Sequence, residues 1–332
     1  MSPEEKVLVI GSNSFSGASF INFLLKQEAS VIGVSRSAEA HKVFLPYRWP
    51  EPDRNFRFFR FDINHDLDGL MTLVEKEKPG YVVNFAAQSM VGESWKHPDQ
   101  WFMTNVVSAI RLHERLRNCD FMRKYVHVTT PEVYGSTEGF ITENAQFNPS
   151  TPYAVSRAAG DMSLRTFFEA YKFPVVFTRA ANVYGPGQQL YRIIPRTILF
   201  ILLGRKLQLH GGGLSKRSFI HMNDVSEATW RIAQHGPDGE TYHISTREIV
   251  TVRELVERIC NKLGVSFDDN VEVVGERLGK DAAYMLDSSK LRKTLGWRDI
   301  VSLDSGLEEC VAWVKENLDT LRTQPFDYIH RP

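Results

Sequence analysis

Two short segments of the chain carry the residue types best suited to proton transfer. The first is a β-branched run that ends in hydroxyls and a carboxylate, among them Thr130 and Glu132. The second begins after a proline and places Tyr153 and Arg157 four residues apart, so that both side chains lie on one face of a helix. A positive charge about 4 Å from a phenol, at an effective dielectric near 20, contributes roughly 4 kcal/mol, or about three pKa units. We therefore expect Arg157 to bring the Tyr153 phenolate within reach of neutral pH; an isolated pair would instead be a surface tyrosine beside a solvated arginine.

The elements around these segments alternate between strand and helix. Strand-length hydrophobic runs are expected near residues 6–10, 30–34, 56–61, 81–88, 126–130 and 174–178, with amphipathic helices between most of them. This alternation predicts an α/β fold, a Rossmann-type doubly wound parallel sheet, whose reactive side chains stand at the carboxyl ends of strands. Beyond residue 180 the alternation breaks, and we expect a smaller C-terminal substrate-binding lobe. The predicted boundaries are residues 1–180 with about 217–246 for the dinucleotide-binding domain, and about 181–216 with 247–332 for the lobe.

The start of the chain reads as a strand, a glycine-containing turn and a helix. The turn holds Gly11 and Gly17, and a second strand follows about twenty residues further on. Free backbone N–H groups and the helix dipole converge at such a turn and form an anion site. The arrangement predicts a bound dinucleotide, and a plain strand-to-helix turn is the alternative.

The ends of the next three strands indicate how the dinucleotide would lie. Arg36, flanked by two serines, stands where an NAD-selective protein carries a carboxylate for the ribose 2′-hydroxyl. A guanidinium suits a 2′-phosphate, so we favour NADP over NAD, with a solvated loop arginine as the alternative. Asp62 and Ile63 are expected on the adenine side, and the small residues Ala86 and Ala87 would let the cofactor lie close to the backbone.

The composition narrows the classes of partner. The 332 residues are 42% hydrophobic and 24% charged, and 40 basic side chains balance 40 acidic ones. This balance does not favour nucleic acid or an anionic membrane as a partner. The three cysteines lie far apart without C-x-x-C spacing, which argues against a disulfide framework or a metal site. A reducing compartment, the cytoplasm, is the expected location.

In their order along nearly the whole chain, these landmarks resemble those of the extended short-chain dehydrogenase/reductases that act on nucleotide sugars. The motifs are the glycine turn, Asp62-Ile63, Asn84-Phe85-Ala86-Ala87-Gln88, Thr129-Thr130-x-Glu132-Val133-Tyr134-Gly135, Tyr153-x-x-x-Arg157, Asn182-Val183-Tyr184-Gly185-Pro186 and Arg217-Ser218-Phe219-Ile220-His221. Within that group, Thr130-x-Glu132 looks like dTDP-glucose 4,6-dehydratase. The Arg36 loop and Ala87-Gln88-Ser89 look more like GDP-mannose 4,6-dehydratase.

The resemblance implies a 4,6-dehydration of a nucleotide-activated hexose. Tyr153 would take the proton of the sugar 4-hydroxyl as hydride leaves C4, Thr130 would hold that oxygen, and Arg157 would hold the nicotinamide ribose. Glu132 would then remove the C5 proton, which the 4-ketone acidifies. Water leaves from C6 and hydride returns there, so NADP or NAD stays tightly bound and is regenerated in each cycle. An epimerase acting at C4 needs no such carboxylate, and Glu132 is therefore the discriminating residue.

The resemblance also assigns binding residues and an assembly. The implied cofactor residues are Gly11, Ser14, Phe15, Gly17, Arg36, Asp62, Ile63, Ala86, Ala87, Asn105, Tyr153 and Arg157. The implied substrate residues are Gln88, Thr130, Asn182, Arg217, Arg277 and Tyr284, the two arginines beside the diphosphate unless they are ordinary surface residues. The helices after Asp99 and Pro152 resemble those that pair into a homodimer.

Three positions depart from the family pattern. Ser14 replaces a middle glycine, where it crowds the approach of the pyrophosphate or donates a hydrogen bond to it. Pro131 replaces an aspartic acid that protonates the leaving hydroxyl, and Arg157 replaces a lysine with a larger, planar cation. These departures keep two alternatives open, a nucleotide-sugar 4-epimerase and a catalytically weak member that binds a nucleotide sugar.

Overall fold

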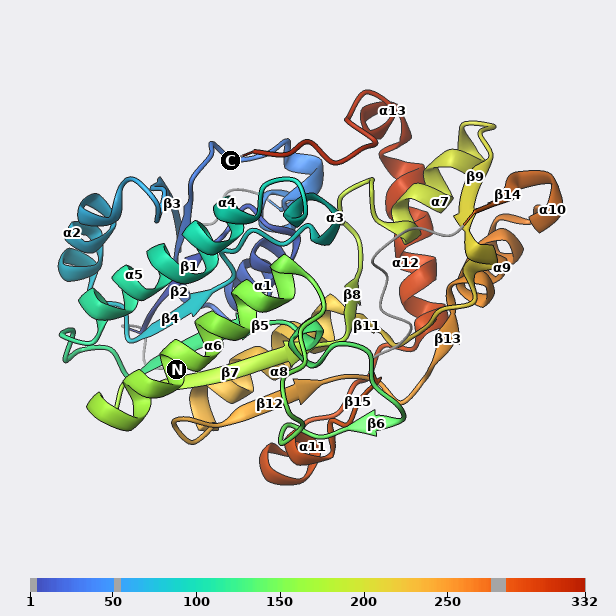
Figure 1. The fold of residues 1–332 in the computed structure, drawn as a ribbon. Coiled ribbons are helices and arrows are strands. Elements are labelled where there is room, and N and C mark those ends of the chain that lie inside the picture. Colours follow the sequence, from blue (N-terminus) through green and yellow to red (C-terminus); the bar gives the residue numbers. More distant parts are fainter. Residues whose placement is uncertain (1–4, 51–54, 276–284, 332) are drawn as a thin grey trace.

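The computed structural model describes residues 5–50, 55–275 and 285–331. Within these residues, seven parallel strands form the central sheet in the order β12-β7-β5-β4-β1-β2-β3 (Figure 1). The strands are β1 Lys6–Ile10, β2 Ser30–Ser35, β3 Phe56–Arg60, β4 Tyr81–Asn84, β5 Lys124–Thr129, β7 Val175–Ala180 and β12 Thr241–Ile244. The order reverses beside β1, as in a doubly wound sheet, and the predicted fold class is confirmed.

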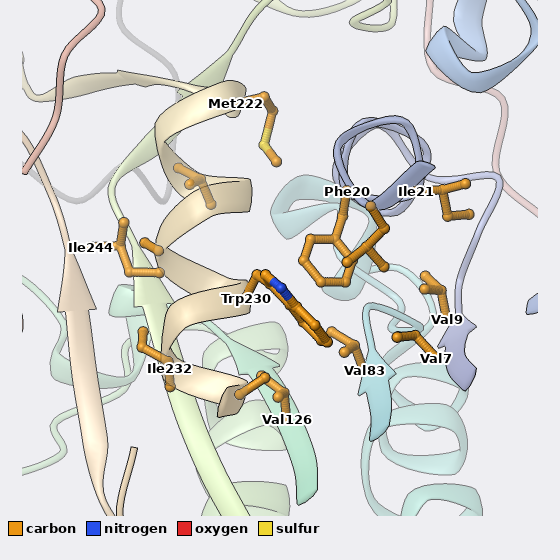
Figure 2. Close-up of a cluster of buried hydrophobic side chains, with 14 of the residues drawn as sticks. Val7, Val9, Phe20, Ile21, Val83, Val126, Met222, Trp230, Ile232 and Ile244 are labelled. Atoms are coloured by element: carbon orange, nitrogen blue, oxygen red, sulfur yellow. The ribbon is translucent and has the colours of Figure 1, made fainter. Parts of the chain in front are cut away.

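Helices cover both faces of this sheet. They are α1 Phe15–Lys26 and α8 Met222–His235 on one face, and α2 Leu67–Glu77, α5 Ala109–Leu116 and α6 Pro152–Tyr171 on the other. Because both faces of the sheet are buried, β1 is hydrophobic at successive positions. Val7 and Val9 pack with the residues of α1 and α8, whereas Leu8 and Ile10 pack with those of α2, α5 and α6. In Figure 2, Trp230 of α8 and Phe20 of α1 fill the space between the two helices and the sheet.

The helical stretch over residues 98–116 is continuous but changes from α-helical to π-helical winding and back. It consists of α4 Pro98–Phe102, a π-helical segment η3 Met103–Ser108, and α5. The backbone of α6 approaches this segment closely, since a Cβ at Gly160 would lie 2.8 Å from the Asn105 carbonyl oxygen. Short π segments are frequent at functional sites, and this one carries Asn105 toward the end of β4.

A separate hydrophobic cluster forms the core of the smaller lobe. It joins α7 Ile193–Leu202, α9 Val252–Leu263 and α12 Leu303–Glu316 with β9 Leu207–His210 and β14 Val271–Val274. Val43, from the segment η1 Lys42–Phe44, belongs to the same cluster, so the lobe also packs against an early part of the chain. The domain boundaries expected from the sequence remain a prediction.

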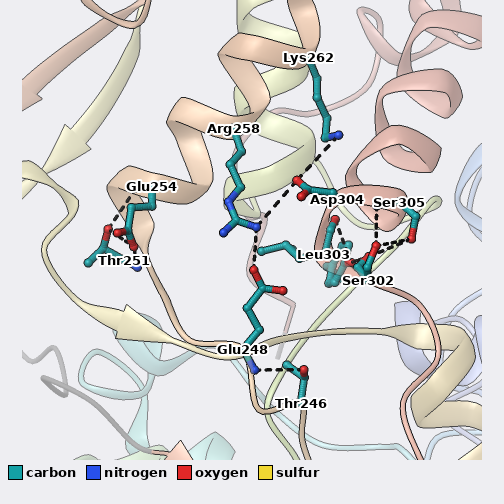
Figure 3. A network of polar contacts seen from close by, with 11 residues as sticks. Thr246, Glu248, Thr251, Glu254, Arg258, Lys262, Ser302, Leu303, Asp304 and Ser305 are labelled. Carbon is teal, nitrogen blue, oxygen red and sulfur yellow. Dashed lines mark hydrogen bonds and ion pairs between the residues drawn. The ribbon is translucent and has the colours of Figure 1, made fainter.

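Polar contacts tie the ends of two lobe helices together. Thr251 and Glu254 form a capping box at the start of α9. Figure 3 shows Arg258 of α9 between Glu248, at 2.7 Å, and Asp304 at the start of α12, at 3.8 Å. These contacts hold α9 and α12 together.

The remaining elements are short. They are η2 Pro46–Arg48, α3 Val91–Ser94, η4 Pro131–Tyr134, β6 Phe140–Ile141, β8 Asn182–Tyr184, η5 Gly211–Gly213, β10 Lys216–Arg217, β11 Phe219–His221, β13 Val250–Thr251, α10 Phe267–Asn270, β15 Met285–Leu286, α11 Ser289–Leu295 and α13 Leu318–Leu321. Among the described residues, no helix has the length and apolar character needed to cross a bilayer.

Candidate active site

The turn between β1 and α1 is built so closely that only glycine fits. A Cβ at Gly11, whose φ is +86°, would lie 2.7 Å from the Ala86 nitrogen. A Cβ at Gly17 would lie 2.3 Å from the Gly11 carbonyl oxygen. The backbone of the first turn and that of the loop after β4 therefore form a shallow cradle that matches a dinucleotide lying against main chain.

Ser14 closes the turn from within. Its hydroxyl donates to the Gly11 carbonyl at 2.7 Å and accepts from the Gly17 N–H at 3.0 Å, which caps α1. The serine proton is therefore used inside the turn rather than offered to a pyrophosphate. Phe15, the first residue of α1, is buried and faces Gly185 of the loop after β8.

The ends of β2 and β3 lie side by side at the edge of the sheet. Arg36 follows β2, and its main-chain carbonyl accepts a hydrogen bond from Arg60 Nε at the end of β3. Asp62 accepts from the Asn64 N–H at 2.8 Å, which shapes the turn that buries Ile63. The sheet register thus brings the predicted adenosine-side residues to one edge.

Asn105 makes its side-chain contacts inside the protein. Its amide oxygen accepts from the Gln88 N–H, and its amide nitrogen donates to the Gln88 carbonyl and to Ser156. These contacts join η3, α6 and the loop after β4, and the expected role of Asn105 in cofactor binding stays a prediction. On the other side of that loop, Asn84 accepts from the Ala86 N–H, so the segment that carries Ala86 and Ala87 is fixed at both ends.

The four predicted catalytic residues come together at the end of β5. Thr130 caps η4 by accepting from the Glu132 N–H at 3.3 Å, and its hydroxyl is hydrogen-bonded to Tyr153 at the start of α6. Tyr153 and Arg157 are both buried, on the same side of α6. Arg157 donates to the Val128 carbonyl of β5. Its buried Nε has no hydrogen-bond partner among the described residues, which leaves a donor for a bound molecule.

The expectation for the Tyr153 pKa is wrong. Burial of the phenol, and then the Glu132 carboxylate, raise its pKa to about 12. Arg157 acts in the opposite direction, as do the hydrogen bond with Thr130 and the charge of Arg192, but their effect is smaller. The attraction of a single cation is outweighed by the lost hydration of the buried phenolate and by the repulsion from the nearby Glu132 carboxylate.

Arg192 is a site residue that the sequence analysis missed. It immediately precedes α7 in the lobe, and its charge acts on Tyr153. Neither a motif nor a periodicity marks it, because only the packing of the lobe against the sheet domain brings it to the catalytic tyrosine.

A buried charged cluster lies beneath the catalytic residues. Asp161 of α6 accepts from Arg179 at 2.8 Å and from Thr129 at 3.0 Å, and lies 3.3 Å from His127. Arg179 also donates to the Tyr134 hydroxyl at the end of η4. Burial alone would raise the pKa of Asp161, but the charge of Arg179 and the contact with His127 hold it well below its usual range. The cluster joins β5, η4, α6 and β7 and thereby sets the position of Thr130, Glu132 and Tyr153.

The predicted substrate residues are brought together only in part. The Asn182 N–H donates to the Ser218 carbonyl where β8 pairs with β11, and Arg217 lies in β10 and donates to the neighbouring Lys216 carbonyl. Gln88 is buried, and its amide donates to the Arg331 carbonyl. Arg277 and Tyr284 lie outside the described residues.

Fold and site together define a class of protein. A doubly wound parallel sheet with a glycine cradle after β1 is a dinucleotide-binding fold. The tyrosine, threonine and carboxylate at the end of β5 add groups for proton transfer beside that cradle.

Comparisons with known proteins agree with this class. The family model described as GDP-mannose 4,6 dehydratase matches residues 8–310, and the chain belongs to this family of extended short-chain dehydrogenase/reductases. A probable dTDP-glucose 4,6-dehydratase of Sinorhizobium fredii is 32% identical over 94% of this chain and 93% of its own. The human dTDP-D-glucose 4,6-dehydratase is 34% identical over 80% and 76%.

Solved structures show the same fold. The dTDP-glucose 4,6-dehydratase DesIV from Streptomyces venezuelae, solved with NAD bound, superposes with a TM-score of 0.88 at 31% identity, over 95% of this chain and 98% of its own. The UDP-glucose 4-epimerase of Thermotoga maritima superposes with a TM-score of 0.86 at 26% identity, over 94% and 99%.

Proposed function

We propose that the protein dehydrates a nucleotide-activated hexose to its 4-keto-6-deoxy derivative, with NAD or NADP as the cofactor. The observation that carries the proposal is the position of Glu132, two residues after Thr130 and close enough to Tyr153 to raise its pKa. The family and the relatives named as 4,6-dehydratases support the same activity.

The side chains divide the reaction between them. When bound, the nicotinamide accepts hydride from C4 of the sugar and returns it at C6. Tyr153 removes the proton of the 4-hydroxyl, and Thr130 holds that oxygen by a hydrogen bond. Once C4 is a ketone, Glu132 removes the acidified C5 proton. Arg157, whose buried Nε has no hydrogen-bond partner within the described part of the chain, would hold the cofactor.

Pro131 requires a different source for the proton that leaves with the C6 hydroxyl. Proline has no ionisable group, and Glu132 holds a proton after it has acted at C5. Passing this proton to the C6 hydroxyl, directly or through a water, releases water and returns Glu132 to its carboxylate form. One carboxyl group then serves both steps of the elimination.

The cradle fits a dinucleotide, but the preference for NADP stays a prediction. Arg36, on which that preference rests, donates to the Arg331 carbonyl, while several solved relatives carry NAD. Affinities of the protein for NAD and NADP, measured side by side before and after an Arg36→Ala substitution, decide between the two. If Arg36 binds the 2′-phosphate, the affinity for NADP falls more than the affinity for NAD.

We also propose that the protein forms a homodimer. Exposed apolar side chains gather on neighbouring helical segments, namely Phe102, Met103 and Val107 on α4 and η3, and Val155 and Met162 on α6. An exposed apolar face of this kind marks an interaction surface. Light scattering on the wild type and on Met162→Asp tests this, with a dimer and a monomer as the expected results. Location in the cytoplasm stays a prediction.

The activity is tested with a panel of dTDP-, GDP-, UDP- and CDP-hexoses, without added reductant. Mass spectrometry would show the loss of one water from one member of the panel, and ultraviolet absorbance in alkali would show the 4-ketosugar. An isomer of unchanged mass would instead support a 4-epimerase. Binding of a nucleotide sugar without any product would support a member of the family that only binds.

A further inference from the structure

Residues 325–331, which we call the strap, run from the lobe to the residues that follow the carboxyl ends of β2 and β4. In Figure 1 this segment, coloured red, leaves α13 beside α7 and extends over the gap between the lobe and the sheet domain toward the end labelled C. It contains no helix or strand. A segment without secondary structure is ordered only where other contacts hold it.

The lobe holds the first part of the strap. Arg196 of α7 donates to the Phe326 carbonyl and pairs with the Asp327 carboxylate, both at 2.9 Å. The Phe326 ring packs edge-on against Phe200, with 5.9 Å between the centroids, and the Arg205 guanidinium lies 5.1 Å from its centroid. These contacts fix the strap to one face of α7.

The middle of the strap contacts the segment just before α7. The Tyr328 ring packs edge-on against Tyr191, with 5.4 Å between the centroids. Burial and then Tyr191 raise the pKa of Tyr328, while the charges of Arg36 and Arg192 act in the opposite direction. The charge of Arg192 thus acts on both Tyr328 and Tyr153.

The sheet domain holds the far part of the strap. The His330 ring stacks on Trp101 and on His97, with centroids 5.2 Å and 5.3 Å away, and its Nε2 lies 2.6 Å from the Gln100 amide oxygen. These three partners lie on α4 and directly before it.

A single carbonyl then joins two cofactor-edge residues. The Arg331 carbonyl oxygen accepts from Arg36 Nη2 and from Gln88 Nε2, each at 2.9 Å. Arg36 follows β2 and Gln88 follows β4, so this oxygen spans the carboxyl ends of strands on either side of β1. Both donors are side-chain tips. Among the described residues, no hydrogen bond or ring contact joins the strap to the backbone of the glycine turn at residues 11–17, which forms the floor of the cradle.

We propose that the strap forms the outer wall of the dinucleotide site and holds the cofactor against the glycine turn between turnovers. The inference rests on the proposed function, because a cofactor that is reduced and reoxidised within one cycle must stay bound throughout it. The strap is attached to the lobe and to the sheet domain, touches the cofactor residues Arg36 and Gln88 at their side-chain tips, and makes no contact with the glycine turn among the described residues. It opens for cofactor exchange by release of His330 and Arg331.

The test measures cofactor release directly and needs no nucleotide sugar. The purified protein is loaded with NADH or NADPH and mixed with excess oxidised cofactor, and the loss of nicotinamide fluorescence gives the dissociation rate. A variant lacking residues 325–332 should release the cofactor about tenfold faster or more, and it should retain less cofactor through purification. His330→Ala should act in the same direction by a few-fold.

Ile329→Ala is the matched control. Ile329 lies between Tyr328 and His330, whose rings pack against the protein, but its own side chain is 61% exposed. Its truncation should therefore leave the dissociation rate unchanged. Circular dichroism checks that each variant is folded, and if the deletion variant does not fold, His330→Ala and Ile329→Ala carry the comparison alone.

Two results would overturn the proposal while leaving the dehydratase assignment intact. One is an unchanged dissociation rate in the folded deletion variant and in His330→Ala. The other is faster cofactor association with unchanged release, which would make the strap an obstruction. If the full-length protein binds neither dinucleotide, the proposed function itself fails, and the strap proposal fails with it.

Discussion

The cofactor cradle and the catalytic corner, which consists of Thr130, Glu132, Tyr153 and Arg157, are built by different means. At the cradle, main chain meets main chain, and the two glycines that permit this leave no room for a Cβ. At the corner, side chains from η4 and α6 meet over a buried cluster in which Asp161 and Arg179 carry opposite charges. The cradle therefore depends on the absence of side chains, whereas the corner depends on charges that the protein interior must compensate.

The largest effect is expected at the catalytic tyrosine. Tyr153→Phe removes the hydroxyl that takes the substrate proton, so kcat should fall by about 10²- to 10⁴-fold. Cofactor affinity, which the cradle determines, should change little. Tyr171→Phe, at the exposed end of the same helix, is the control and should retain full activity. An equal loss of cofactor affinity in Tyr153→Phe would show that the two regions are not separable.

Glu132→Gln should separate the two halves of the reaction. Oxidation at C4 needs Tyr153 and Thr130 but not this carboxylate, so substrate should still reduce the bound cofactor. Elimination should slow by about 10²-fold or more, and reduced cofactor should accumulate, visible by its absorbance. Glu138→Gln, an exposed position, should behave as the wild type. Unimpaired product formation by Glu132→Gln would remove the main argument against an epimerase.

Arg179→Met tests whether the buried cluster supports the corner. The substitution leaves the Asp161 carboxylate buried without its cation, and we expect a loss of about 3–5 kcal/mol in the free energy of unfolding. Chemical denaturation measures this loss. Arg322→Met removes an exposed pair with Asp319 and should change stability by less than about 0.5 kcal/mol. A similar small change for both would mean that the cluster does not hold η4 and α6 together.

Gly17→Ala tests the cradle. The added Cβ would lie 2.3 Å from the Gly11 carbonyl oxygen, so the turn must shift, and dinucleotide affinity should fall by about tenfold or more, which calorimetry would measure. Gly92→Ala meets no atom within 4 Å and should leave the affinity unchanged. Retained affinity in Gly17→Ala would show that the cradle tolerates more side chain than its geometry indicates.

The pH dependence tests the catalytic tyrosine without any substitution. Burial and Glu132 raise the pKa of Tyr153 to about 12, so only a small fraction of the phenol is ionised at neutral pH, and this fraction grows with pH. Between about pH 6 and pH 9, kcat/KM should therefore rise, by at most about tenfold per unit. A rate that falls over this range would mean that Tyr153 acts in its protonated form.

Much of this architecture follows from the sequence because it is encoded locally. The hydrophobic runs of β1 to β5, the glycine turn and the Thr251 cap all depend on residues a few positions apart, and all are present. The meeting of Thr130, Glu132 and Tyr153 was also predictable, because parallel strands bring their carboxyl ends to one edge.

Other features of the site were decided only by tertiary packing. The Tyr153 pKa rises because the surrounding protein excludes water, and sequence spacing carries no measure of that exclusion. Asn105 binds the loop after β4, and Arg192 reaches Tyr153 from the lobe. The Arg331 carbonyl lies beside Arg36, although 294 residues separate these two along the chain. The sequence by itself determined the helices, the strands and the chemical groups. The dielectric environment and the long-range partners of those groups exist only once the sheet domain and the lobe have packed together.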